Sequence, residues 1–298
     1  MRFRASIENV PSFYRIIQAI EKLQKKCIIK FGEEEMSIIC NNDANEGGIQ
    51  VWSQIKVQSL FSGYRIQSNA DNEITMSVSG DALLAALRSA SSSPSASSYD
   101  TTEVVVKLAK KNEHAALSFE IAGMTGQGRQ VKVAHDVRID VMKPGDVARL
   151  KEPLCPEPDT HVILPPLQKL RTIVERMRPM SDVLAIRASN NGKLQLAIST
   201  DSVTVETQWT NCTNPDMSSG GATQSQSDDD EKPDPDDLFE VHVSTRGFLK
   251  FLNSHLISTT TIACICKDHC LILYVYIGEA ADAGGVLTFY IPAIIDDD

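Results

Sequence analysis

The chain has 298 residues, enough for about two domains, and 42% of them are hydrophobic, which excludes a disordered chain. Its net charge of −10, taken as a whole, argues against a nucleic-acid partner. However, residues 228–237 and the three aspartates at 296–298 carry nine of these ten net negative charges. Such charge runs are usually solvated segments, so the position of the basic residues decides whether DNA is a partner.

No apolar stretch reaches the ~18 residues that a membrane-spanning helix needs. The first ten residues lack the apolar core of a signal peptide, so we expect an intracellular protein. The chain has seven cysteines, an odd number, and free thiols are therefore expected.

Strand-like and helix-like segments alternate in the first half. Residues 1–7 alternate apolar and polar side chains as a strand does, and Pro11 suits the start of a helix. Strand-like runs follow at residues 27–31, 36–40 and 49–57. The same order then returns as a strand at 73–79, a helix at 80–90, and strands at 104–108, 115–121 and 131–141.

Residues 143–160 interrupt this order with four prolines and no periodicity, which predicts an extended, stiff connector. After it the order returns twice. The third unit is a strand at 162–164, a helix at 165–177, and strands at 183–188, 194–198 and 203–209. The fourth unit is a strand at 239–243, a helix at 246–256, and strands at 260–266, 271–277 and 286–291.

The sequence therefore predicts a domain at residues 1–142, a connector at 143–160 and a second domain at 161–298. Residues 211–237 are rich in Ser, Gly, Gln, Asp and Pro, so we expect a disordered acidic insert there. A strand–helix–three-strand unit that occurs four times indicates a repeat architecture. One helix per unit against long sheets is an α+β arrangement.

The polar sides of the four predicted helices are basic. The residues concerned are Arg15, Lys22, Lys25, Arg88, Arg171, Arg176, Arg178, Arg246 and Lys250. For one helix, a solvated surface with pairs such as Glu21 with Lys25 is the simpler interpretation. For four helices in equivalent positions, a shared positive surface is favoured, and it suits phosphate backbones without sequence specificity. No aromatic residues interleave with these bases, so stacking on single strands is not indicated.

Particular segments, together with the order of elements, resemble a known family. These segments are MRFRASI at the start, GIQVW at 48–52, EPLCPEPDTHVILP at 152–165, VERMRPMSDVLAIRASNNGKLQLAIST at 174–200 and FYIPA at 289–293. They resemble the Hus-family subunit of the heterotrimeric DNA-damage checkpoint clamp. The plan of two tandem domains is similar to the sliding clamp proliferating cell nuclear antigen. The insert at 211–237 and the Ser/Pro-rich residues 89–98 depart from the family pattern.

The resemblance implies a non-catalytic subunit of a ring of three different chains around duplex DNA with a single-strand junction at damage sites. It implies a location in the nucleus, and also in the cytoplasm before assembly. An ATP-driven checkpoint clamp loader would load this ring, which would recruit kinase signalling and repair factors. The nine basic residues would then face the DNA. Ring closure would use two edge strands, one with Val131 and Val133 and the other with Val203 and Val205. Unpaired edges of this kind favour an obligate partner.

Other functions stay open at this point. Within clamps, the alternative is a homotrimeric replication processivity clamp, and outside them a scaffold without a DNA role. A zinc site at Cys264, Cys266 and Cys270, with His255 and His269 nearby, is disfavoured, because Cys264 and Cys266 lie two apart in a strand and are expected in the core. No Walker loop, His-Glu-x-x-His or Gly-x-Ser-x-Gly motif is present, so we expect no enzyme, cofactor or metal.

The acidic insert contains two Ser/Thr-Gln pairs, the dipeptide that checkpoint kinases prefer. Thr223 and Ser225 each precede a glutamine and are therefore candidate phosphorylation sites. Added phosphate there would deepen the negative charge without touching the packing of the core.

Overall fold

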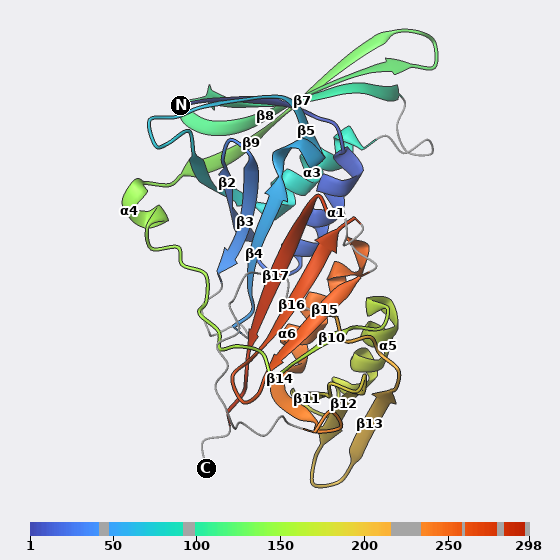
Figure 1. Cartoon of the computed structure of the whole chain (residues 1–298). Helices are drawn as coiled ribbons and strands as arrows, with labels where there is room; N and C mark the ends of the chain where they lie inside the picture. The colour runs from blue at the N-terminus through green and yellow to red at the C-terminus, as the bar shows by residue number, and fades with distance from the viewer. Residues whose placement is uncertain (42–47, 92–98, 216–233, 258–259, 279–282, 296–298) are drawn as a thin grey trace.

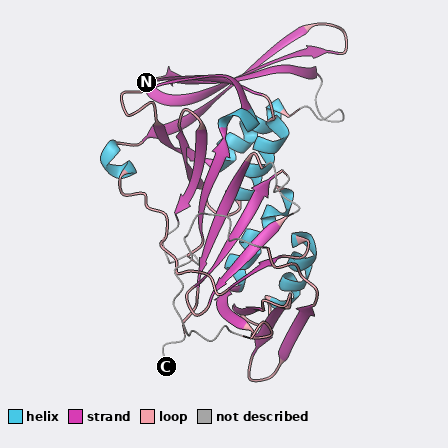
Figure 2. Ribbon diagram, viewed as in Figure 1, coloured by secondary structure: helices cyan, strands magenta, loops and turns pink. Residues whose placement is uncertain are grey.

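The computed structural model describes residues 1–41, 48–91, 99–215, 234–257, 260–278 and 283–295. Within them, long sheets carry most of the helices on one side (Figures 1 and 2). The first half contains β1 (Arg2–Ile7), α1 (Val10–Glu21), β2 (Lys26–Phe31), β3 (Glu35–Asn41), β4 (Gln50–Lys56), α2 (Val57–Leu60), β5 (Phe61–Gln67), β6 (Ile74–Ser79), α3 (Gly80–Ala90), β7 (Tyr99–Lys111), β8 (His114–Thr125) and β9 (Gln130–Val141).

A short helix, α4 (Pro144–Val147), opens the segment between the halves, and residues 149–158 that follow it have no helix or strand. The second half contains β10 (Thr160–Ile163), α5 (Leu167–Met177), β11 (Val183–Ala188), β12 (Leu194–Ser199), β13 (Thr204–Trp209), β14 (Phe239–Ser244), α6 (Thr245–Phe251), the 3-10 helix η2 (Leu252–Leu256), β15 (Thr261–Cys266), β16 (Cys270–Ile277) and β17 (Gly285–Pro292).

The predicted order of strand, helix and three strands is found in all four units. Sequence reasoning missed α2 and β5, which lie between the first two units. The cause is a broken alternation: Gly63 has a left-handed backbone (φ +54°), and the pairing of β5 with β1 shifts register between Arg4 and Ser6. The fourth predicted helix is also two pieces, because the α-helix ends at Phe251 and continues only as the 3-10 helix η2.

Short polar side chains fix where the helices begin. Asn9 accepts a hydrogen bond from the Ser12 N–H (3.1 Å) at the start of α1, and Ser79 accepts one from the Ala82 N–H (3.4 Å) at the start of α3. Ser244 does the same for Gly247 in α6 (3.2 Å). These bonds satisfy N–H groups that a first helical turn leaves without partners.

One strand pairing joins the two halves into a single sheet. β17, the last strand, pairs antiparallel with β4 of the first half, from Gly285 opposite Ile55 to Tyr290 opposite Gln50. The resulting sheet has the strand order β10-β15-β16-β17-β4-β3-β2-β6-β9-β8-β7-β1-β5, and β13-β12-β11-β14 form a second sheet. The sheet therefore runs through the boundary between the halves without a break.

This joining sheet has two chemically different faces, because side chains alternate along a strand. Leu287, Phe289 and Ile291 of β17 are fully buried on the helix side, where the Phe289 ring meets Phe251 edge-on at a centroid distance of 5.1 Å. Thr288 and Tyr290 point the opposite way, toward the connector. The helices and the connector thus lie on opposite faces.

The two ends of the predicted insert 211–237 lie on the body of the protein. The Thr213 carbonyl accepts from the Ile163 N–H (2.8 Å), and the Asn214 side chain donates to the carbonyls of His161 (2.6 Å) and Ser189 (3.0 Å). At the other end, Lys193 Nζ lies 2.7 Å from Asp236 Oδ1. Disorder is thus the wrong prediction for these anchored ends, since the polar composition of the segment conceals their hydrogen bonds. The rest of that prediction, residues 216–233, lies outside the described residues.

A substitution at Gly285 tests how much the pairing of β4 with β17 contributes to the stability of the protein. A Cβ atom there would lie 2.5 Å from the Gln54 carbonyl oxygen and 2.7 Å from the Ile55 Cα atom, both in the backbone of β4. We expect Gly285→Ala to lower the free energy of unfolding by about 1–3 kcal/mol, because β17 must move away from β4. Urea denaturation measures this loss. Gly126→Ala is the matched control, since its Cβ would meet nothing within 4 Å. Equal stability of the two variants would contradict the account.

Candidate nucleic-acid interface

The helices that follow the first strand of each unit form one continuous row. α3 packs on α1, α1 on η2, and η2 and α6 on α5. Figure 2 shows these helices gathered on one side of the sheets, with α4 alone far from them. The row brings together basic residues from both halves of the chain.

Six of the nine predicted DNA-facing residues lie within these helices: Arg15, Arg88, Arg171, Arg176, Arg246 and Lys250. Arg171 and Lys250 are half-buried, and the other four are exposed. The remaining three lie at or beyond helix ends. Lys22 and Arg178 are the C-terminal caps of α1 and α5, and Lys25 lies in the turn before β2. Assigning Lys22 and Lys25 to the first helix was wrong, because the chain tightens after Ile20, whose carbonyl accepts from the Leu23 N–H (2.9 Å).

Four of the nine basic side chains surround one cavity of about 270 Å³ between α5 and α6. Arg171, Arg178, Arg246 and Lys250 line it together with Leu249, Asn253 and a single carboxylate, Glu175. Four cations against one carboxylate make this cavity a strongly positive part of the helix row. Arg176 of the same helix does not line the cavity.

Hydrogen bonds hold Arg171 in place between two helices. Its Nε donates to Glu175 Oε1 (2.8 Å) one turn along α5, and its NH1 group donates to Asn253 Oδ1 (2.9 Å) in η2. Asn253 in turn donates to the carbonyls of Leu249 (3.3 Å) and Lys250 (2.9 Å). Arg171 therefore fixes the cavity wall, and its substitution would disturb packing as well as charge.

Two other cations of the row have acidic partners, and of these Asp182 is exposed whereas the Glu21 side chain is only 18% exposed. Arg246 Nε lies 3.3 Å from Asp182 Oδ1, and Lys22 Nζ lies 2.9 Å from Glu21 Oε2. The proposed pair of Glu21 with Lys25 is thus wrong, because Glu21 contacts Lys22 instead. The hydrogen bond and charge of Glu21 raise the pKa of Lys22 above its ordinary value, so Lys22 stays charged at neutral pH. Exposed pairs contribute little stability, so Arg246 can exchange the Asp182 carboxylate for a phosphate at small cost.

The two strand edges expected to close a ring differ in how much of their length lacks a neighbouring strand. β13 is the last strand of its sheet and pairs only with β12 among the described residues. Val205 on it is half-buried opposite Ile198, whereas Val203 lies in the turn before the strand and is 41% exposed. In the described part of the chain, residues 130–138 of β9 pair on one side only, because β6 reaches only residues 139–141. Val131 and Val133 are half-buried there.

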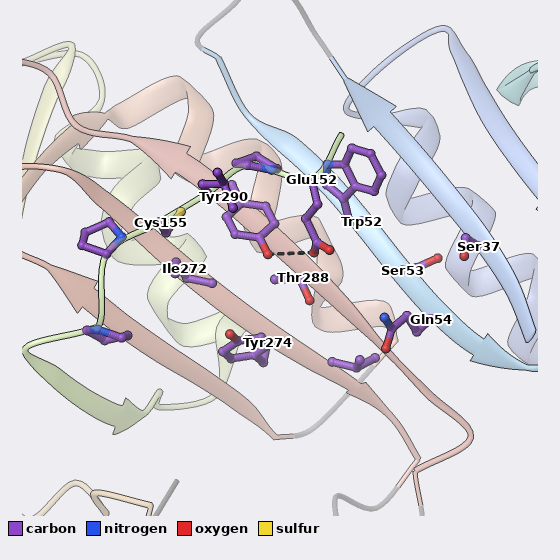
Figure 3. A pocket seen from close by; sticks show the side chains of 15 residues that line it. Ser37, Trp52, Ser53, Gln54, Glu152, Cys155, Ile272, Tyr274, Thr288 and Tyr290 are labelled. Atoms are coloured by element: carbon purple, nitrogen blue, oxygen red, sulfur yellow. Dashed lines mark hydrogen bonds between the residues drawn. The ribbon is translucent and has the colours of Figure 1, made fainter. Parts of the chain in front are cut away.

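The opposite face of the sheet holds a groove of about 600 Å³ beneath the connector, which sequence reasoning did not find (Figure 3). Its floor comes from Trp52 of β4, Tyr274 of β16 and Tyr290 of β17. The Tyr290 hydroxyl donates to Glu152 Oε1 (2.8 Å) and so ties the connector to the sheet, while burial and this bond raise the pKa of Tyr290. In strands that alternate apolar and polar side chains, aromatic residues at the polar positions were the sequence signal that could have indicated this groove.

The predicted core positions of Cys264 and Cys266 are confirmed, since both are buried on β15. Burial raises the pKa of Cys264 to about 12. Among the described residues, no group of three or more His, Cys, Asp or Glu side chains could hold a metal ion. No helix in this same part of the chain is both long and apolar enough to cross a membrane. Thr223 and Ser225 lie outside the described residues.

Sheets backed by a row of helices on one face, with a connector on the other, are the architecture of a sliding clamp. The structure resembles the crystal structure of Proliferating Cellular Nuclear Antigen from Entamoeba histolytica with a TM-score of 0.68. The alignment covers 98% of this chain and 99% of that chain at 12% sequence identity. The predicted α+β sliding-clamp fold, with two tandem domains of two units each, is confirmed.

Sequence comparison identifies the family within this class. A family model described as Hus1-like protein matches residues 1–295. The chain is 32% identical over 300 residues to Checkpoint protein hus1 of Schizosaccharomyces pombe, covering 99% of this chain and 100% of the relative. It is 27% identical over 303 residues to Checkpoint protein HUS1 of Homo sapiens, with the same coverage of 99% and 100%. The chain therefore belongs to the Hus1-like protein family, as its resemblance predicted.

Substitution of two basic residues that line the cavity between α5 and α6 tests whether this part of the helix row contacts DNA. We expect the double variant Arg178→Gln and Lys250→Gln, in the assembled ring, to bind duplex DNA with a weaker salt dependence. Each phosphate contact contributes about 0.9 to the slope of log K against log salt concentration, so the slope should fall by about 2. Fluorescence anisotropy over a salt series measures it.

The matched control removes the same charge from the opposite face. Lys143→Gln with Lys151→Gln changes two exposed lysines of the connector. We expect this control to keep the original salt slope. An equal fall in both double variants would show that the helix row is not the DNA-facing surface.

Proposed function

We propose that this protein is a non-catalytic subunit of a heterotrimeric ring that encircles duplex DNA at damage sites. The observation that carries the proposal is the row of helices across both halves, with its cations on one face. A ring that slides needs contacts that are electrostatic, individually weak and independent of sequence. Long Lys and Arg side chains on a rigid helix row meet that need.

The unpaired edges support assembly with partner chains. β13 and the first part of β9 leave backbone N–H and C=O groups without a strand neighbour among the described residues. Such edges invite pairing with another strand, and a ring would satisfy them. The same proposal includes an ATP-driven clamp loader, which would place the ring around DNA, and a location in the nucleus, where that DNA lies.

The groove beneath the connector supports a second part of the function, the recruitment of signalling and repair proteins. It lies on the face opposite the helices and combines aromatic residues with the polar groups of Glu152 and Gln54. A partly apolar groove with a few polar groups suits a short peptide segment of a client protein. Clients bound there would not compete with DNA for the helix row.

A homotrimeric replication clamp is the alternative, and the oligomeric state distinguishes it. The whole-length match to proteins named checkpoint protein favours the heterotrimer. We expect size-exclusion chromatography with light scattering to give a monomer for this chain alone and a trimer only with two different clamp subunits. A stable homotrimer of this chain would contradict the proposal and support the replication clamp.

A single substitution on an edge should break the ring. We expect Val203→Asp to prevent trimer formation with the two partner subunits, because it places a charge beside the edge that β13 would offer to a neighbour. Leu238→Asp is the control, since Leu238 is similarly exposed at 40% but precedes β14 instead. The same light-scattering measurement applies. Trimers of equal yield from both variants would rule out β13 as an interface.

A further inference from the structure

A row of cations crosses three strands of the first half, outside the helix row. Arg4 of β1 lies directly opposite Arg65 of β5 on one side and Lys107 of β7 on the other. Arg4 and Arg65 are exposed, and Lys107 is half-buried. Side chains at directly opposite positions lie close together on one face of a sheet, so these three positive charges are neighbours. Arg4, Arg65 and Lys107 define this cation row.

The cation row lies on the face of the sheet opposite the helices. Phe3, Ala5 and Ile7, which alternate with the polar residues of β1, are buried in the core. On that buried side the Phe13 ring of α1 meets Phe61 at a centroid distance of 5.7 Å. Figure 1 shows α1 and α3 together on one side of β5 and β7. The cation row therefore points into solvent, away from the proposed DNA-facing surface.

The row also lies away from the strand edge that would close a ring. The sheet ends in the order β9-β8-β7-β1-β5, so β8 separates all three cations from β9. A partner strand that pairs with β9 would therefore leave Arg4 and Arg65 accessible.

Little within the protein balances these charges. Lys107 forms an ion pair with Glu120 of β8. In the described part of the chain, no carboxylate forms an ion pair with Arg4, with Arg65 or with Arg2, which is exposed on the same face of β1. Like charges directly opposite each other in a sheet are destabilising. The row therefore opposes the stability of its own sheet, and a bound anion would relieve this repulsion.

We propose that the cation row is a docking surface for an acidic segment of a partner protein, rich in Asp and Glu. The row spans two strand spacings, about 10 Å. An extended segment with acids at alternate positions carries three carboxylates over about 13 Å, a similar length. Each arginine can bind a carboxylate through two parallel N–H···O bonds.

Two observations favour a protein segment over DNA. First, carboxylates interrupt the positive surface: Glu120 contacts Lys107, and Asp136 of β9 continues the same cross-strand row beyond Ser118. A DNA backbone carries closely spaced charges and would bring phosphates against these carboxylates, whereas a protein segment can place neutral residues there. Second, DNA inside a ring would contact the helix row, on the other side of the sheet.

The test uses the full chain and a fluorescein-labelled peptide of alternating Glu and Ser residues at low salt. We expect fluorescence anisotropy to show binding that weakens about tenfold in the double variant Arg4→Gln with Arg65→Gln, which loses two exposed ion pairs. The matched control is Lys110→Gln with Arg129→Gln. It removes two exposed cations outside the row and should keep the wild-type affinity.

Three results of this binding experiment would overturn the proposal. They are no binding to the wild type, equal affinity of the wild type and the Arg4 and Arg65 variant, and an equal loss in the control. The urea midpoint of the Arg4 and Arg65 variant should equal or exceed that of the wild type, because repulsion is removed. A lower midpoint would show that these arginines serve the stability of the fold, and would also overturn the proposal.

A second measurement separates an acidic protein segment from DNA as the occupant. In the assembled ring, we expect the Arg4 and Arg65 variant to keep the wild-type salt slope for duplex DNA. A slope lower by about 2 would assign the row to DNA contact and overturn the proposal. Failure of the peptide to bind would leave the proposed clamp function intact, because that function is tested separately at Arg178 and Lys250.

Discussion

The backbone pairing between β4 and β17 is the constraint on which the rest of the structure depends. It makes one sheet from two halves of the chain and so fixes the relative position of their helices. Because side chains alternate along β17, the same pairing assigns one face to the helix row and the other to the connector. The proposed function, with DNA on one side and client proteins on the other, needs this separation.

The distribution of charged residues also separates the helix row from the rest of the chain. Most of the net charge of −10 belongs to one internal run and the last three residues, whereas basic side chains collect on the helix row. Electrostatic attraction acts over about 8 Å in physiological salt, so local clusters of charge matter more to a DNA backbone than the total charge. The acidic composition of the chain is therefore compatible with DNA as a partner.

Much of the fold could be predicted from the sequence because local patterns and the tertiary structure agree. The short apolar run at residues 183–188 and the apolar spacing in residues 80–90 predicted the strand β11 and the helix α3 within their observed bounds. β5 could not be predicted, because a left-handed glycine and a register shift break its alternation. Nor could the β4–β17 pairing, which joins strands far apart in sequence.

The residues of the candidate site could be predicted from the sequence, but their arrangement in space could not. Helical spacing identified Arg171, Arg178, Arg246 and Lys250, but no sequence pattern indicated that they surround one cavity. The ends of the helices were harder to place, and Lys22 and Lys25 therefore fall outside α1.

Site-specific photocrosslinking tests most directly the claim that the helix row faces DNA and the connector faces proteins. A photoreactive amino acid would replace Lys250 in the helix row or Leu154 in the connector, which is 97% exposed. The rings would be loaded on closed circular duplex DNA before irradiation. The account predicts DNA crosslinks from position 250 and none from position 154. Crosslinks from position 154 with none from position 250 would contradict it.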